Sequence, residues 1–227
     1  MYVTHSAQAA PSSAAFLYAE PQPARPDASH QRKCAPGTHL FREGDDAANV
    51  YEVVLGVLRL TRVLRNGKRQ VIAFGLRGDI VGFPNGTRHH TDCEVLATAQ
   101  IIPYRRRVFE AGQCEPQTHQ RLIRAALGEI SAMQDHFMML ARKSAIEKVA
   151  SFLLLLSRRT GVPVGNCTAF SLPMSRADIA DFLGLTIETV SRAFSALRKS
   201  GSIALETPQR VLVRDLEALI NASQIDD

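Results

Sequence analysis

Residues 172–200 read LPMSRADIADFLGLTIETVSRAFSALRKS, and this stretch predicts two short helices joined by a tight turn. Ser175 and Asp178 have the spacing of a capping box, in which each residue caps the start of a helix. Gly184 ends the first helix, and Thr186 can cap the second. Apolar residues recur at helical spacing, so the stretch predicts a helix-turn-helix; they are Ile179, Ala180, Leu183 and Leu185, then Ile187, Val190, Phe194 and Leu197.

The outer face of the second helix carries polar residues on its first turns. Such a helix fits the major groove of DNA, where its N-terminal side chains meet base edges. Arg192 can donate two hydrogen bonds to guanine, Glu188 can accept one from the cytosine amino group, and Ser191 can bond a base or a phosphate. We predict that these three residues read the bases. The alternative is an amphipathic helix pair with an incidental Glu188–Arg192 salt bridge.

Hydroxyls at helix N-termini and nearby basic side chains are suited to DNA phosphates. The residues predicted to hold phosphates are Ser175, Arg176, Thr186, Thr189, Arg198 and Lys199. The whole chain has a net charge of +5, yet residues 171–227 contain six basic and eight acidic side chains. Bulk charge therefore does not support DNA binding, whereas residues 189–205 contain no acidic side chain.

A short hairpin is predicted directly after the two helices. Residues 203–205 and 210–213 are apolar runs on either side of Glu206-Thr207-Pro208-Gln209. Such a hairpin would form a wing beside the helix-turn-helix.

A long helix is predicted from Pro116 to Lys143, because Pro is favoured in the first turn and only Gly128 interrupts the pattern. Its apolar residues follow spacings of three and four, the seam of a coiled coil. The predicted homodimer seam is Ile123, Ala126, Ile130, Met133, Phe137 and Leu140. The alternative is that the helix packs on its own domain, since Leu122, Leu127, Met138 and Met139 widen the stripe.

The chain before this helix is predicted to form β-structure from Gly37 to about Ala111. Short apolar runs alternate with glycines, and Asn66-Gly67 between two runs is a strong hairpin signal. The predicted strands are 50–55, 57–64 and 70–74. A further helix is predicted from Ser144 to Arg159, and residues 161–163 stop it.

The remaining composition excludes several classes of protein. The first 33 residues are rich in Ala, Ser and Pro and lack the features of a secretory signal, so we expect a mobile tail on a cytoplasmic protein. No apolar run is long enough to span a bilayer. The four cysteines are scattered, which argues against a disulfide framework. No P-loop, G-x-S-x-G, H-E-x-x-H or dinucleotide fingerprint is present, and we do not expect an enzyme.

The motifs together resemble the Crp-Fnr family of bacterial transcription regulators. The resemblance covers nearly everything after Cys34. It is carried by residues 37–83, residues 128–159 and Gly184-Leu185-Thr186 followed by the Glu-x-x-Ser-Arg of residues 188–192. It implies an α+β fold with a cyclic-nucleotide-binding-like β-roll, a long dimerisation helix and a C-terminal winged helix-turn-helix. The expected segments are a tail (1–33), the roll (34–115), the dimerisation helix (116–143) and the DNA-binding domain (144–227). In the Fnr-FixK branch these reading residues imply a TTGAT-N4-ATCAA-like palindrome.

The resemblance also bears on ligands of the roll. Cyclic-nucleotide-binding relatives hold the phosphate with Gly-Glu followed by Arg-Ser or Arg-Thr, but here Gly78 precedes Asp79 and Arg88 precedes His89. Oxygen-sensing relatives use several cysteines for an iron–sulfur cluster, but Cys34 stands alone and Gln100 takes the place of the last ligand. We therefore expect no cofactor. A metal or haem site among residues 89–94 (His89, His90, Asp92, Cys93, Glu94) is conceivable, although a solvated loop explains them equally, and we assign no metal.

These features most resemble the FixK-like members, which lack the cluster and act downstream of a separate oxygen sensor. The main hypothesis is a homodimeric activator of low-oxygen genes, including nitrogen-fixation or denitrification genes, with double-stranded DNA and RNA polymerase as partners. The alternative hypothesis is a regulator of the same fold that is gated by haem, nitric oxide or a metabolite.

Overall fold

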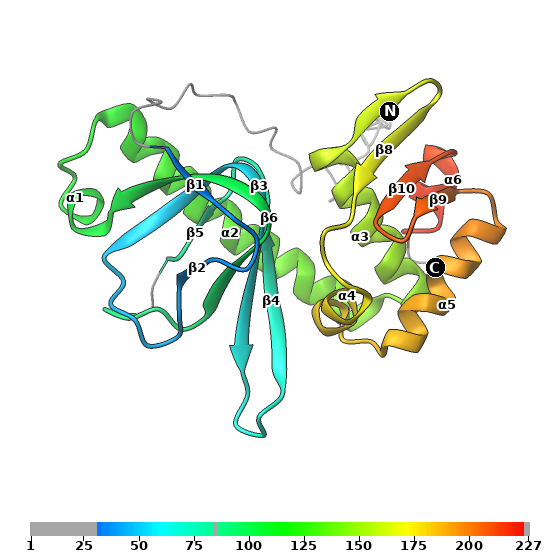
Figure 1. Ribbon diagram of the computed structural model, residues 1–227, viewed down its shortest axis with the longest axis horizontal. Coiled ribbons are helices and arrows are strands. Elements are labelled where there is room, and N and C mark those ends of the chain that lie inside the picture. The colour runs from blue at the N-terminus through cyan, green and yellow to red at the C-terminus, as the bar shows by residue number, and fades with distance from the viewer. Residues whose placement is uncertain (1–30, 84–85, 225–227) are drawn as a thin grey trace, which may run out of the picture.

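The computed structural model describes residues 31–83 and 86–224, which form an N-terminal roll, a long helix and a C-terminal domain (Figure 1). The predicted α+β fold class is confirmed. The predicted tail lies outside the described residues except at its end, where strand β1 begins at Arg32 and not after residue 33. No helix formed by the described residues is both long and apolar enough to cross a bilayer.

The roll is an antiparallel sheet in which β1 pairs with β6, β6 with β3 and β3 with β4. The short strands β2 and β5 pair with β6 and β3. Their bounds are β1 Arg32–Cys34, β2 His39–Phe41, β3 Asn49–Val63, β4 Arg69–Gly75, β5 Ile80–Val81 and β6 Asp92–Arg105. Buried apolar residues from these strands, among them Val53, Leu58, Val95 and Ile101, form the core of the roll.

Strand β3 corrects one prediction, because the runs 50–55 and 57–64 are a single strand. Gly56 adopts a φ of 97° and causes irregular pairing with β6 without ending the strand. A Cβ at this position would lie 2.6 Å from the carbonyl oxygen of Thr98, so only glycine fits here. The predicted hairpin at Asn66-Gly67 is confirmed, with Gly67 at a φ of 77° between β3 and β4.

A second correction concerns the end of the roll. The β pattern was predicted to extend to about Ala111, but residues 106–110 form a short helix, α1 (Arg106–Glu110). Helix α2 (Pro116–Arg142) follows and runs behind the roll in Figure 1. Its Leu122 is fully buried with Val50 and Ile80, which attaches the helix to the roll.

The C-terminal domain begins with α3 (Ala145–Thr160), which Ser144 caps as part of a capping box. Its other elements are β7 Val162–Val164, β8 Cys167–Ser171, α4 Arg176–Leu183, α5 Ile187–Lys199, β9 Ile203–Thr207, β10 Arg210–Val213 and α6 Leu216–Asn221. Gly165 and Asn166 form the turn of a hairpin between β7 and β8. These strands extend the predicted wing into a sheet of order β7-β8-β10-β9.

The roll and the C-terminal domain share a packed boundary. Leu76, which follows β4, is buried in the same cluster as the core residues of α3, α4 and α5. Phe182 of α4 contacts Phe74 of β4 at 5.2 Å and Phe152 of α3 at 5.7 Å between ring centroids. His136 of α2 stacks on the same Phe182 ring at 4.2 Å. Helix α4 is therefore the element on which the roll, α2 and α3 meet.

Apolar side chains remain uncovered along α2 in the described chain. Leu122 is buried and Met139 is partly buried, but the other side of the helix faces solvent. The exposed fractions are 41% for Ile123, 61% for Leu127, 54% for Ile130, 61% for Met133, 69% for Phe137 and 54% for Met138. Ala126 and Leu140 are half-buried. The helix thus packs on its own roll with one face and leaves most of the predicted seam free.

Glu129 of α2 makes stability depend on pH. Burial, together with the negative charge of Asp79, raises the pKa of Glu129 to about 7. A raised folded-state pKa means that stability is greatest below the unfolded value of 4.5 and is lost as the pH rises through 7. We therefore expect Glu129→Gln, which stays neutral, to be more stable than the parent at pH 8 by on the order of 1–3 kcal/mol. This gain should shrink toward pH 5 in urea unfolding.

The control is Gln134→Ala, an exposed position on the same helix that carries no ionisable group. Its effect on the free energy of unfolding should be the same at pH 5 and pH 8. An equal effect of Glu129→Gln at both pH values would show that Glu129 is charged in the folded protein throughout this range.

Candidate nucleic-acid interface

Helix α4 begins with the capping box that the sequence predicts. The Ser175 hydroxyl accepts a hydrogen bond from the Asp178 backbone N–H at 3.1 Å, and the Ser175 backbone N–H donates to the Asp178 carboxylate at 3.0 Å. The helix ends at Gly184, which has the left-handed conformation with φ 63°. Both ends of α4 are therefore fixed by local sequence.

Helix α5 starts at Ile187, and Thr186 caps it by accepting a hydrogen bond from the backbone N–H of Thr189 at 3.1 Å. Val190, Phe194 and Leu197 are buried against the core as predicted, and Ala193 joins them. Ile187 was expected to face inward but is 53% exposed. It lies in the first turn, where the helix projects beyond the core.

The three residues predicted to read bases lie together on the exposed first turns of α5. The side chains of Glu188 and Arg192 are 73% and 78% exposed and form an ion pair with a 2.5 Å separation. The Ser191 hydroxyl donates to the carbonyl of Ile187 at 2.9 Å. The predicted alternative, a salt bridge between Glu188 and Arg192, is thus present, but an exposed pair stabilises a helix only slightly. Both groups remain accessible to a ligand.

The residues predicted to hold phosphates lie at the start of α4 and at both ends of α5. Thr186 and Thr189 adjoin the reading residues and contact each other through their hydroxyls at 2.8 Å. Arg198 and Lys199 are exposed in the last turn of α5, roughly 15 Å along the helix from Glu188 at a rise of about 1.5 Å per residue. Ser175 is exposed at the start of α4.

Arg176, another predicted phosphate ligand, is packed against the protein and is not a free surface side chain. Its guanidinium lies over the Phe194 ring at 3.5 Å from the centroid and reaches the carbonyl of Pro208 at 3.5 Å. Burial lowers its pKa below the ordinary value for arginine. Arg176 therefore links α4, α5 and the turn of the wing, which makes it a packing residue as well as a candidate contact.

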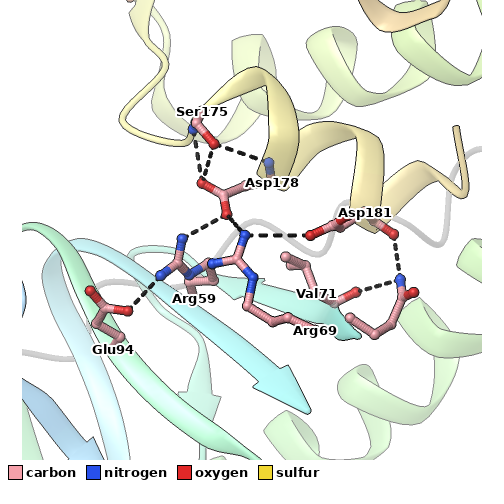
Figure 2. A network of polar contacts seen from close by, with 8 residues as sticks. Arg59, Arg69, Val71, Glu94, Ser175, Asp178 and Asp181 are labelled. Carbon is pink, nitrogen blue, oxygen red and sulfur yellow. Dashed lines mark hydrogen bonds and ion pairs between the residues drawn. The ribbon is translucent and has the colours of Figure 1, made fainter. Parts of the chain in front are cut away.

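The structure also brings together residues that the sequence did not connect. Figure 2 shows Arg59 of β3 and Arg69 of β4 turned toward Asp178 of α4. Arg59 lies 2.6 Å from the Asp178 carboxylate and 2.5 Å from that of Glu94 on β6. No local signal could have revealed this network, because Arg59 and Asp178 are 119 positions apart.

The carboxylate of Asp178 is affected both by its capping contacts with Ser175 and by the arginines of the roll. Asp178 is only 3% exposed, and burial alone would raise its pKa. Hydrogen bonds from Ser175 and the charge and hydrogen bond of Arg59 outweigh this effect, so the pKa of Asp178 is lowered. Its charged form is therefore the one that the folded protein favours.

In the roll, Asp79, which departs from the nucleotide-binding pattern, and Arg88, which matches it, both make internal contacts. Asp79 accepts from the backbone N–H of Leu76 at 2.8 Å and pairs with Arg159 of α3 at 2.7 Å. Arg88 donates to the carbonyl of Gly44 at 2.6 Å. Asp79 therefore links the roll to α3, and Arg88 binds the backbone of its own domain.

The histidine, cysteine and acidic side chains of residues 89–94 make separate contacts and do not form one cluster. His89 is buried and stacks on Phe41 at 3.7 Å, and burial lowers its pKa. Burial raises the pKa of the Cys93 thiol to about 12, while Glu94 pairs with Arg59. Among residues 31–83 and 86–224, no group of three or more such side chains could hold a metal ion.

Comparison with known proteins agrees with this architecture. Residues 31–111 match the model of the cyclic nucleotide-binding domain, and residues 147–222 match that of the Crp-like helix-turn-helix domain. The nitrogen fixation regulation protein FixK of Azorhizobium caulinodans is 41% identical over 187 residues, which cover 82% of this chain and 75% of the relative. This chain belongs to the Crp-Fnr family.

Other members of the Crp-Fnr family are similar over comparable lengths. The transcriptional activator protein FnrL of Cereibacter sphaeroides is 36% identical over 204 residues, 87% of this chain and 82% of FnrL. The solved structure of FixK2 from Bradyrhizobium japonicum has a TM-score of 0.76 and 34% identity, and covers 87% of this chain and 98% of FixK2. The family consists of transcription regulators and not enzymes, so this Crp-Fnr protein is a DNA-binding transcription regulator of FixK-like type.

The N-cap of α5 gives a direct test of how the candidate interface is held. Thr186→Ala removes the acceptor for the Thr189 N–H and should lower the free energy of unfolding by about 1 kcal/mol. Urea unfolding of the full chain measures this loss. Ser195→Ala, an exposed change on the same helix, should alter stability by less than about 0.5 kcal/mol. Equal stabilities of the two variants would mean that Thr186 does not cap α5 in solution.

Proposed function

We propose that this Crp-Fnr regulator binds a TTGAT-N4-ATCAA-like palindrome as a homodimer and activates genes for low-oxygen metabolism. The observation that carries the proposal is the exposed group Glu188, Ser191 and Arg192 on the first turns of α5. An arginine and a glutamate can together specify a guanine and a cytosine in the major groove. The Glu188–Arg192 ion pair holds both side chains on one face of the helix before they meet DNA.

Dimerisation is supported by the apolar side chains along α2. Ile130, Met133 and Phe137 are each more than half exposed, and they follow the spacing of a coiled-coil seam. Exposed apolar residues that form one continuous stripe are typical of a surface that binds a partner. A second copy of α2 presents the same stripe, and two-fold symmetry in the protein matches a palindrome in the DNA.

The pathway is inferred from the names of relatives. Similar proteins include regulators of nitrogen fixation and of fumarate and nitrate reduction, and several are described as transcriptional activators. We propose that this regulator acts on bacterial promoters in the cytoplasm, together with RNA polymerase, under low oxygen.

We propose that neither a cyclic nucleotide nor a metal controls this activity. The two departures from the nucleotide-binding pattern support the first part, because Asp79 pairs with Arg159 and His89 stacks on Phe41. The absence of a metal is supported by the separate contacts of three candidate ligands. His89 stacks on Phe41, Cys93 is buried in the core, and Glu94 pairs with Arg59.

The alternative is a regulator gated by a small molecule, and one feature favours it. A cavity of about 510 Å³ lies at one end of the roll, lined by residues 46–49, Thr87 and residues 105–108, which include three arginines. Native mass spectrometry and an absorbance spectrum of protein purified without oxygen distinguish the two cases. A bound haem or metabolite would favour the alternative, whereas DNA binding by the ligand-free protein would favour the proposal.

The base-reading role of Arg192 is tested by Arg192→Ala. Loss of a bidentate contact to guanine should weaken binding to a TTGAT-N4-ATCAA duplex by on the order of 1–3 kcal/mol and relax specificity at that base pair. A gel-shift titration against the palindrome and its single-base variants measures both effects.

Arg198→Ala is the matched control, because it removes the same charge from the far end of α5. If Arg198 contacts a phosphate, binding should weaken about equally on all sequences, with a salt slope smaller by about one. Undiminished affinity of Arg192→Ala for the palindrome would show that Arg192 does not read bases.

The proposed dimer is tested by Ile130→Glu, which places two like charges against each other at the centre of the seam. Sedimentation velocity should show monomers at concentrations where the parent is dimeric. Ala132→Glu, an exposed position outside the seam, should remain a dimer. A dimer of unchanged affinity after Ile130→Glu would exclude this stripe as the interface.

A further inference from the structure

The roll holds the first helix of the helix-turn-helix through a defined set of charges. Arg59 lies between the carboxylates of Glu94, on its own sheet, and Asp178, on α4 (Figure 2). Arg69 on the neighbouring strand reaches the same Asp178 oxygen at 2.7 Å and Asp181 at 3.4 Å. Two guanidiniums of the roll therefore converge on one helix of the DNA-binding domain.

These contacts are largely shielded from water. The side chains of Asp178 and Arg59 are 4% and 14% exposed, whereas that of Arg69 is 39% exposed. A carboxylate that stays buried without its cations is strongly disfavoured, so α4 must keep its contacts with both arginines as long as Asp178 is packed against the roll. The planar guanidinium also restricts direction more than an apolar contact does.

The orientation of α4 determines that of α5. Only residues 184–186 separate the two helices, and Ile179 and Leu183 of α4 share a buried core with Val190 and Phe194 of α5. The amide of Gln70 on β4 also donates to the backbone carbonyl of Asp181. The reading residues are therefore connected to the roll through one rigid pair of helices.

We infer that Arg59 and Arg69 are positioning residues for DNA binding. They fix α5 relative to the roll and to α2, and so set the separation of the two reading helices in a dimer. This inference rests on the proposed function, because the separation matters only when two half-sites are bound together. Neither arginine reads a base. Together they determine the spacing between half-sites at which the dimer binds most tightly.

The variant that tests this role is Arg59→Gln with Arg69→Gln, which leaves the capping carboxylate of Asp178 in place. The control is Arg62→Gln with Arg65→Gln, which removes the same charge from exposed positions of the same β-hairpin. Arg69→Gln alone is a second test variant, because its partly exposed side chain can be removed without leaving Arg59 unpaired. Thermal unfolding identifies any variant that is not folded.

The measurement is fluorescence anisotropy with duplexes whose TTGAT and ATCAA half-sites are separated by two to six base pairs. We expect the parent and the control to prefer one spacing. In the double variant, affinity for that spacing should fall about tenfold, while affinities for the other spacings should change little. Arg69→Gln should show the same loss of preference to a smaller extent.

Two results would overturn the inference while leaving the proposed function intact. In the first, the folded arginine variants keep the parent's affinity and spacing preference. In the second, they lose affinity by the same factor at every spacing, as a merely structural role predicts. If the parent binds none of the duplexes, the proposed function is wrong and the inference fails with it.

Discussion

The two parts of this regulator are joined at the carboxylate of Asp178. This group caps α4 through Ser175 and at the same time accepts hydrogen bonds from Arg59 and Arg69 of the roll. Because it is almost fully buried, its charge is stabilised by these partners in place of water. The two carboxylate oxygens of Asp178 therefore serve both to cap the start of α4 and to bind the arginines that orient it.

The roll has the fold of a ligand-binding domain, but its key side chains stabilise the protein itself. Asp79 pairs with Arg159 of α3, and His89 fills space beside Phe41. The ion pair of Asp79 with Arg159 is a second connection between the roll and the C-terminal domain. The fold alone therefore does not indicate a ligand, whereas the contacts of individual residues bear on the question.

Features that depend on a few neighbouring residues could be predicted from the sequence. The capping box at Ser175, the left-handed Gly184 and the hairpin at Asn66-Gly67 are all of this kind. Gly56 was misinterpreted as a break between strands, because a glycine that permits a bulge has the same sequence signature as one that permits a turn. Ile187 fits the apolar periodicity of α5 but lies beyond the edge of the core. The network around Arg59 depends on tertiary structure, and periodicity carries no information about it.

The uncovered stripe on α2 has a consequence for how the protein responds to its own abundance. If only paired chains present two reading helices, the concentration of competent protein at low expression rises with the square of the chain concentration. A twofold change in synthesis would then give up to a fourfold change in the species that occupies a promoter. Side chains such as Phe137, left open to solvent in the single chain, would thereby make gene expression respond steeply to protein level.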